Sequence, residues 1–216
     1  MNMPRIIPAI LVQNENDFRK QISLAAAFAP MIQIDVLDGT MLPERAWNNA
    51  KAAAAMRLSI PFEAHLMVNN PELKAPAWVR AGAKRVIIHA EARGSIGLTL
   101  DQIRQAGRLA GIAVNPETDL ETIKEYIPFL DHIQLMGVHP GAQGRSFEDE
   151  TVDRVRALKR AYPHITIGVD GGVSGQHGIA AKLAAAGADD LVVGSAIWTA
   201  TNPAEAYRKI EAEVKI

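Results

Sequence analysis

The segment Met31-Ile-Gln-Ile-Asp-Val-Leu-Asp-Gly39 decides the fold, because it has the pattern of a short strand that ends in acidic residues. Alternate residues of a strand share a face, so the isoleucines and the valine form an aliphatic face that can pack under a helix. Gln33, Asp35 and Leu37 lie on the opposite face. A carboxylate on an interior face is unfavourable unless it is paired, hydrogen-bonded or bound to a metal. Asp35 is therefore a candidate functional residue, and the alternative is that it caps a helix or closes a turn.

The composition is that of a globular protein. The chain has 216 residues, 48% hydrophobic and 22% charged, with a formal net charge of -1. This length suits one domain, and the near-neutral charge argues against a nucleic-acid or membrane-surface binder. No apolar run approaches the roughly 18 residues of a membrane span, and the start has no signal-peptide core. The chain has no cysteine, which excludes disulfides and thiolate sites, and we expect a cytoplasmic protein.

Outward from this segment, the chain repeats a strand followed by a helix eight times. Strands are expected over residues 6–11, 31–37, 62–67, 85–89, 111–114, 132–136, 166–169 and 191–193. Helices are expected over 14–29, 47–57, 71–81, 98–109, 120–127, 148–161, 178–186 and 203–214, with Pro76 kinking or splitting the third. Alternating strands and helices imply a parallel sheet. Eight such units predict one α/β domain, a single (β/α)8 TIM barrel over residues 1–216.

Polar residues gather at the ends of the expected strands, where such barrels carry their chemistry. Asp35 ends the second strand, His65 lies near the end of the third, and Asp170 ends the seventh. The second and seventh strands are three steps apart around the ring, so we expect these two carboxylates to face each other across the mouth. Two acids on opposite sides of a carbon can remove a proton from one face and return one to the other. Inversion of a stereocentre next to a carbonyl requires this transfer.

The same three residues offer ligands for a divalent metal. Proton removal next to a carbonyl gives an enediolate, whose oxygens are usually stabilised by a metal ion. One imidazole nitrogen from His65 and carboxylate oxygens from Asp35 and Asp170 form a suitable ligand set. The alternative for His65 is a hydrogen-bonded core histidine.

Glycine-rich loops follow the sixth, seventh and eighth strands: Gly141 to Gly144, Gly171-Gly172 and Gly194-Ser195. Backbone N–H groups in such loops can bind a phosphate, and the last two loops are the usual phosphate site of this barrel. The glycines therefore predict a phosphorylated substrate, with plain turns as the alternative.

The other histidines are assigned no function. His89 and Glu91 are expected in a solvated loop, with a place at the barrel mouth as the alternative. Ordinary surface or loop positions are expected for His132, His139, His164 and His177.

Short motifs along the chain together resemble the ribulose-phosphate 3-epimerase family. They are Pro8-Ala-Ile-Leu11, Asp35-Val-Leu-Asp-Gly39, His65-Leu-Met-Val68, His89-Ala-Glu91, Asn115-Pro-Glu-Thr118, Met136-Gly-Val-His-Pro-Gly141, Val169-Asp-Gly-Gly172 and Gly194-Ser-Ala-Ile197. The resemblance implies a barrel that interconverts ribulose 5-phosphate and xylulose 5-phosphate, or a related ketose phosphate, in the pentose phosphate pathway. We also expect a homo-oligomer and, from the near-neutral charge, no binding to nucleic acid or membrane.

The resemblance also implies residue roles. Asp35 and Asp170 would be the acid/base residues and, with His65 and Gln33, the ligands of a divalent metal such as Zn, Fe, Mn or Co. The implied substrate-binding residues are His65, Met67, Met136, Gly141, Ala142, Gln143, Gly144, Gly171, Gly172, Gly194 and Ser195.

Several positions depart from the family pattern. Gln33 stands where the family has its fourth metal ligand, a histidine; an amide oxygen can bind a hard ion but is a poor zinc ligand. We therefore expect weaker metal binding than usual. Ala9 replaces a serine, and Leu37 replaces a methionine that lies against the substrate. The loop after the sixth strand ends in Arg145, which can contact the phosphate or face solvent.

Two other functions stay open at this point. A catalytically impaired relative would bind a sugar phosphate or a partner protein without turnover; Gln33 and Ala9 favour it, and the two aspartates oppose it. A barrel decarboxylase or aldolase-like synthase typically carries Asp-x-Lys-x-x-Asp at a strand end. Asp35-Val-Leu-Asp38 has no lysine, which ranks this function last.

Overall fold

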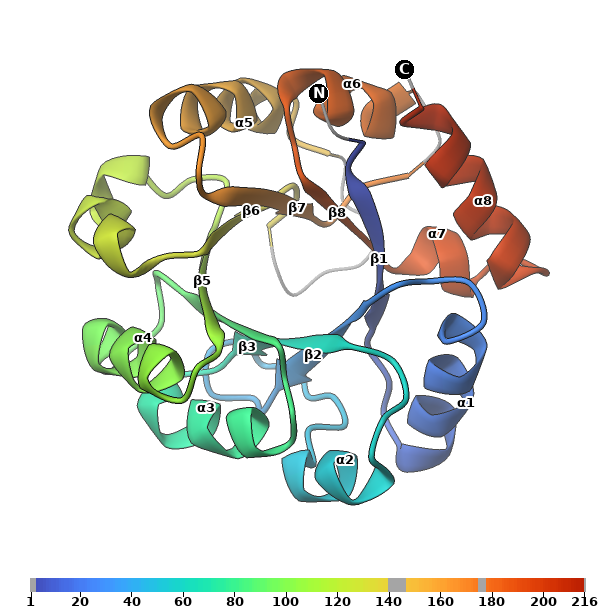
Figure 1. The fold of residues 1–216 in the computed structure, drawn as a ribbon, viewed down its shortest axis with the longest axis horizontal. Helices are drawn as coiled ribbons and strands as arrows, with labels where there is room; N and C mark the ends of the chain where they lie inside the picture. The colour runs from blue at the N-terminus through green and yellow to red at the C-terminus, as the bar shows by residue number, and fades with distance from the viewer. Residues whose placement is uncertain (1–2, 140–146, 175–177, 216) are drawn as a thin grey trace.

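The computed structural model describes residues 3–139, 147–174 and 178–215. Within them, eight parallel strands close into a barrel in chain order, and the helices surround it (Figure 1). The last strand pairs with the first, which removes free sheet edges. The predicted (β/α)8 TIM barrel is confirmed.

The strands are β1 (Arg5–Ile10), β2 (Ile32–Leu37), β3 (Phe62–Met67), β4 (Arg85–His89), β5 (Leu109–Val114), β6 (His132–Met136), β7 (Thr166–Asp170) and β8 (Asp190–Val193). The helices are α1 (Glu15–Ala25), α2 (Ala50–Met56), α3 (Pro71–Arg80), α4 (Ile96–Gln105), α5 (Glu150–Ala161), α6 (Ile179–Ala186), α7 (Ser195–Trp198) and α8 (Pro203–Glu213). A 3-10 helix, η1 (Leu120–Phe129), lies between β5 and β6.

Local sequence explains most of these elements, with two differences. The Asn14 side chain accepts a hydrogen bond from the Asp17 N–H and so caps α1, as residues of this type do. In contrast, α3 continues through Pro76 as one helix, because the buried Ala75 and Trp78 anchor the turn on either side of it. The helix expected after β5 is present as the 3-10 helix η1, two residues longer than expected.

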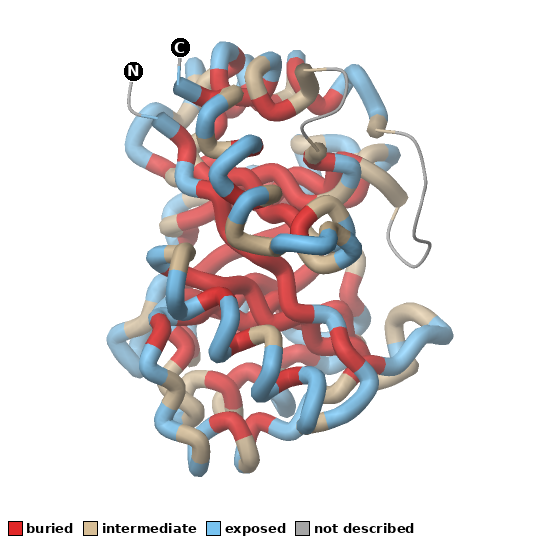
Figure 2. Tube along the Cα trace, turned by 90° about the vertical axis from the view of Figure 1, so that its right-hand side faces the viewer, coloured by how far each residue is buried: buried red, intermediate tan, exposed pale blue. Residues whose placement is uncertain are grey.

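The main hydrophobic core lies between the outer face of the barrel and the helices. Ile32, Ile34 and Val36 of β2 belong to one buried cluster with Phe18 and Ile22 of α1. Figure 2 shows the strands as the buried centre and the exposed residues on the outer elements. Strand alternation therefore turns the other face of β2 into the barrel, as predicted.

The interior of the barrel is rich in polar side chains, although bulky aliphatic residues usually dominate there. Arg85 of β4 donates to Asp190 of β8 at 2.8 Å, and it also bonds to Glu63. Because β4 and β8 lie on opposite sides of the ring, this contact crosses the interior. Arg5 bonds to the same Asp190 from the bottom of the barrel, through two hydrogen bonds.

His132 also lies inside the barrel, so its predicted surface position is wrong. It is fully buried, in space left by glycines on both neighbouring strands. A Cβ atom on Gly168 would lie 2.7 Å from its Cε1, and one on Gly111 would lie 3.3 Å from its Cδ2. Its strand position simply turns it inward.

Among the described residues, no helix has the length and apolar character needed to cross a membrane.

Candidate active site

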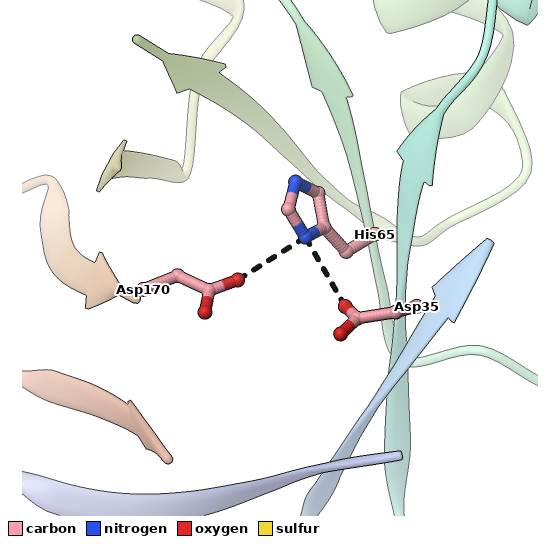
Figure 3. A group of neighbouring side chains, drawn as sticks. All are labelled: Asp35, His65 and Asp170. Atoms are coloured by element: carbon pink, nitrogen blue, oxygen red, sulfur yellow. Dashed lines mark hydrogen bonds and ion pairs between the residues drawn. The ribbon is translucent and has the colours of Figure 1, made fainter. Parts of the chain in front are cut away.

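Asp35, His65 and Asp170 converge inside the mouth of the barrel (Figure 3). They come from β2, β3 and the end of β7. His65 Nδ1 lies 3.3 Å from Asp35 Oδ1 and 3.2 Å from Asp170 Oδ2, and one possible ligand atom from each residue lies within 4.8 Å of the others. The register pairs Asp35 with His65 on adjacent strands, and closure of the barrel brings Asp170 to them. The two carboxylates therefore flank one imidazole.

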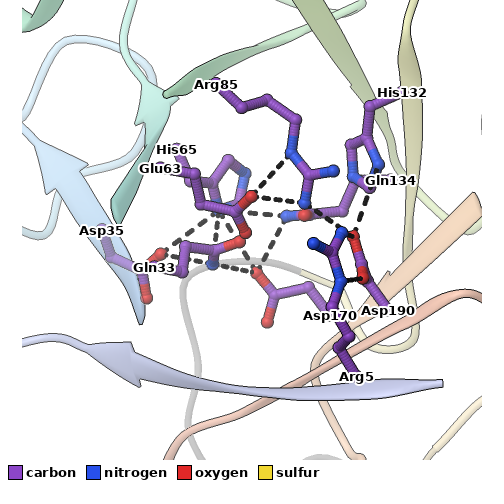
Figure 4. Close-up of polar contacts among 10 residues, drawn as sticks. All are labelled: Arg5, Gln33, Asp35, Glu63, His65, Arg85, His132, Gln134, Asp170 and Asp190. Carbon is purple, nitrogen blue, oxygen red and sulfur yellow. Dashed lines mark hydrogen bonds and ion pairs between the residues drawn. The ribbon is translucent and has the colours of Figure 1, made fainter. Parts of the chain in front are cut away.

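The amide of Gln33 lies between the two carboxylates (Figure 4). Its Nε2 donates to Asp35 Oδ1 at 2.8 Å and to Asp170 Oδ2 at 2.7 Å, and lies 3.3 Å from His65 Nδ1. Its Oε1 is buried and has no hydrogen-bond partner among the described residues. Gln33 thus lies among the possible metal ligands, with its nitrogen, rather than its oxygen, toward them.

Gln134 of β6 is a further member of this cluster that the sequence interpretation missed. Its Nε2 donates to Asp170 Oδ2 at 3.1 Å and lies 3.4 Å from His65 Nδ1. The signal in the sequence was the alternation of His132, Gln134 and Met136 along one face of β6, which places all three inside the barrel.

A chain of polar contacts runs from His65 to the loop after β4. His65 Nε2 lies 2.9 Å from His89 Nε2, and His89 Nδ1 lies 3.2 Å from Glu91 Oε2. The other oxygen of Glu91 accepts from the Asn115 N–H at 2.8 Å. Because a carboxylate accepts at its Nδ1, His89 carries its proton there, and its Nε2 accepts from His65. That arrangement directs Nδ1 of His65 at the two aspartates.

The structure therefore corrects the expected solvated position of His89, which is fully buried, while Glu91 is partly buried. The residue ends β4 with its side chain turned inward. Alternation along β4 places His89 on the same face as Arg85 and Ile87, and this face is turned into the barrel.

Burial and the cluster's charges shift several pKa values. Burial raises the pKa of Asp35, against the lowering effect of hydrogen bonds from His65 and Gln33. Burial alone would lower the pKa of His65, but the two carboxylates raise it to about 9. Burial also lowers the pKa of His89. Without a metal, His65 is thus an imidazolium between two carboxyl groups, and His89 is neutral.

The pKa of Glu91 is lowered, in contrast to that of Asp35. Burial alone would raise the pKa of this carboxyl, but hydrogen bonds from His89, Thr118 and the Asn115 N–H lower it to about 2. Glu91 is therefore an anion at neutral pH and keeps the His89 proton on Nδ1.

Apolar side chains flank the carboxylates. Met67 packs with Leu37 and Ala46, and Met136 packs with Ile87 and Ala113. In register, Met136 pairs with Asp170. Met136 is thus at the level of Asp170, whereas Met67 pairs with Leu37, two residues beyond Asp35.

The described glycine loops lie at the same end of the barrel. Gly171 and Gly172 follow β7 with φ of 94° and 69°, and Gly194-Ser195 leads from β8 into α7. Gly137 packs so closely on the backbone of Gly171 that a side chain there would strike its carbonyl oxygen. The predicted residues Gly141, Ala142, Gln143 and Gly144, together with Arg145 and His177, lie outside the described residues.

The sequence profile described as the ribulose-phosphate 3 epimerase family matches residues 5–198, which is most of the chain. The protein therefore belongs to the ribulose-phosphate 3-epimerase family. Membership places it among the epimerases, which are isomerases, and the family acts on sugar phosphates.

Named relatives agree with this membership. A ribulose-phosphate 3-epimerase of Aquifex aeolicus is 36% identical over 188 residues, covering 85% of this chain and 84% of that protein. The enzyme of Mycobacterium bovis is 36% identical over 211 residues, covering 94% of this chain and 90% of that protein. The chloroplastic ribulose-5-phosphate-3-epimerase of Arabidopsis thaliana is 33% identical over 215 residues, covering 96% and 76%.

Solved structures of other enzymes share the barrel. A 3-hexulose-6-phosphate synthase from Salmonella typhimurium has a TM-score of 0.76 at 17% identity, covering 97% of this chain and 98% of that one. A 3-keto-L-gulonate-6-phosphate decarboxylase from Vibrio cholerae has a TM-score of 0.74 at 13% identity, covering 99% and 98%. At such identities the likeness shows the fold alone.

Proposed function

We propose that the protein epimerises a ketose phosphate at the carbon next to its carbonyl, with Asp35 and Asp170 as the two acid/base residues. The observation that carries this proposal is the placement of the two carboxylates on β2 and β7, on either side of His65. Ribulose 5-phosphate is the substrate that the names of the relatives suggest.

The reaction needs one base and one acid on opposite faces of the substrate. The ionised carboxylate takes the C3 proton, and the bond electrons move into the carbonyl to give an enediolate. The other carboxyl group, which starts protonated, donates its proton to the opposite face of C3 and so forms the epimer. Burial raises the pKa of Asp35, which favours it as the group that starts protonated.

The residues fit a divalent metal. Asp35 and Asp170 would supply oxygen ligands and His65 a nitrogen ligand, from atoms that lie within 4.8 Å of one another. A half turn of the Gln33 amide would present its oxygen, the atom that now lacks a partner. This oxygen-rich set favours a hard ion such as Mn²⁺ over Zn²⁺. A bound ion would supply positive charge for the enediolate oxygens.

The glycine loops after β7 and β8 support a phosphate site. Gly172 and Ser195 are exposed at the same end of the barrel as the carboxylates. Backbone N–H groups of such loops bind the phosphate in barrels of this class. The phosphate would hold the sugar with C3 between the two acids.

The competing function is binding of a sugar phosphate without turnover, and the Gln33 nitrogen at the ligand cluster favours it. Solvent-deuterium uptake separates the two. We expect ribulose 5-phosphate to take up deuterium at C3 in D2O with added Mn²⁺. A double substitution, Asp35→Asn with Asp170→Asn, should reduce uptake by at least about 10²–10⁴-fold.

Asp38→Asn is the matched control. Asp38 follows the same strand, but its carboxylate bonds to Thr40 and Lys74 instead of the cluster, so uptake should persist. Absence of uptake with pentulose and hexulose phosphates alike, with or without metal, would favour the binder.

A further inference from the structure

The Gln33 amide nitrogen lies beside the possible metal ligands, in the position of a fourth ligand. This atom, Nε2, lies within 3.3 Å of a possible ligand atom on each of Asp35, His65 and Asp170. These atoms are within 4.8 Å of one another, and His65 Nδ1 lies 3.3 Å from Asp35 Oδ1 and 3.2 Å from Asp170 Oδ2, so the nitrogen is a fourth corner of the group. Metal–ligand bonds to such atoms are about 2.0–2.2 Å long, so an ion would lie at the centre of the four atoms, next to this nitrogen. The amide N–H bonds are directed at the same carboxylate oxygens, so an ion cannot bind while the amide keeps this orientation.

We propose that the Gln33 carboxamide bridges Asp35 and Asp170 in the metal-free protein and, in this orientation, blocks the metal site. The two N–H bonds of the amide match the two carboxylate oxygens that accept them, one from each wall of the barrel. The acidic pair thus keeps its arrangement without a metal. Gln33 is a positioning residue, because it is fully buried beneath the carboxylates.

The surroundings of Gln33 allow a second orientation of its amide. Oε1 is buried without a partner, and so is Oε1 of Glu63, the residue paired with Gln33 in the neighbouring strand (Figure 4). A half turn of the amide directs the oxygen at the ligand cluster and the nitrogen toward the side of Glu63, which offers an acceptor. The amide therefore either bridges the aspartates or binds the metal. Because metal binding has to break the bridge, the bridge lowers the affinity of the protein for the metal.

This inference rests on the metal site of the proposed function but not on turnover. It is tested with protein treated with EDTA, by calorimetric titration with Zn²⁺ and Mn²⁺ and by ¹H–¹⁵N spectra of side-chain amides. The Gln33 amide signals are identified by their loss in Gln33→Leu. We expect them to be protected from solvent exchange without metal and to move when Zn²⁺ saturates the site.

Two variants complete the test. Gln33→His, which removes the bridge and supplies a nitrogen ligand, should bind Zn²⁺ at least about tenfold more tightly than the unaltered protein. Gln102→Leu is the control, since Gln102 is a partly buried glutamine on α4, outside the barrel. Its metal affinity should stay within about twofold.

The outcomes are distinct. Failure of the unaltered protein to bind metal while Gln33→His binds it would support the inference. Unchanged Gln33 signals at metal saturation would overturn it. Equal affinity of the unaltered protein and Gln33→His, or no binding by either, would overturn it as well. A protein that passes this test but shows no deuterium uptake would keep the inference and lose the proposed function.

Discussion

At the scale of single residues, the site is a set of side chains that fix one another's protons. Glu91 holds the proton of His89 on Nδ1, and His89 in turn accepts from His65. Nδ1 of His65 is then the atom that meets Asp35 and Asp170. Glu91, three contacts away from the aspartates, therefore controls which nitrogen of His65 they face.

Glu91→Gln tests this control. The amide can donate as well as accept, so it no longer holds the His89 proton on Nδ1. We expect kcat to fall by about 10–100-fold with little change in KM, as is typical for partners behind a metal ligand. Separate measurement of kcat and KM, with ¹⁵N spectra of the His89 ring, checks both the rate and the tautomer.

Glu117→Gln is the control, because Glu117 pairs with His139 in an exposed ion pair. Its kcat should not change. An unchanged kcat in Glu91→Gln would show that His89 and Glu91 only fill space.

At the scale of elements, strand alternation carried most of the prediction. It placed Asp35 inside the barrel and the aliphatic face of β2 outside, and the repeated strand–helix pattern predicted the barrel itself. Family motifs added the residue roles. The same alternation, applied to β4 and β6, would also have placed His89, His132 and Gln134 inside.

Other features could not be predicted from local sequence. The bridge from Gln33 joins residues 137 positions apart, so it depends on closure of the barrel. The contact of Arg85 with Asp190 likewise crosses the interior between distant strands. A polar side chain on a strand can face either solvent or a buried partner. Which of the two it faces depends on a partner from a distant part of the chain, which the local sequence does not contain.

The turn after β7 gives a prediction at this scale. Gly171 has a φ of 94° and packs against Val138, whereas Gly107 has a φ of 69° and open space around its Cα. An alanine at either position adopts a left-handed conformation that costs about 1–2 kcal/mol of unfolding free energy. We expect both Gly171→Ala and Gly107→Ala to lose this stability in urea unfolding. Gly171→Ala alone should also raise KM; an equal KM in both variants would contradict a role of this loop in binding.

At the scale of the whole molecule, charged side chains form two separate clusters inside the barrel. The upper cluster surrounds the aspartates, and the lower one joins Arg5, Glu63, Arg85 and Asp190. Burial alone would raise the pKa of Asp190, but Arg85 and the other positive groups around it lower it below its ordinary value. A carboxyl with a lowered pKa stabilises the folded state above its unfolded pKa, and this contribution is lost as pH falls through the folded value.

Asp190→Asn should therefore cost about 3 kcal/mol of unfolding free energy at pH 7, because Arg85 and Arg5 lose a buried partner. The variant should also lose less stability than the unaltered protein on acidification below about pH 4. Urea unfolding across pH measures both effects. Asp153→Asn, which removes an exposed ion pair with Arg156, should change stability by at most about 1 kcal/mol. Equal losses of unfolding free energy in Asp190→Asn and Asp153→Asn would mean that the interior network does not stabilise the barrel.

The central claim is that two carboxylates act from opposite faces of one carbon. The most direct measurement follows C3 deuterium uptake and epimerisation separately in Asp35→Asn and Asp170→Asn, starting from each pure epimer. Each variant retains one base, so we expect both to lose epimerisation and each to exchange the C3 proton of a different epimer. Continued epimerisation by either variant, or exchange of the same epimer by both, would contradict the claim.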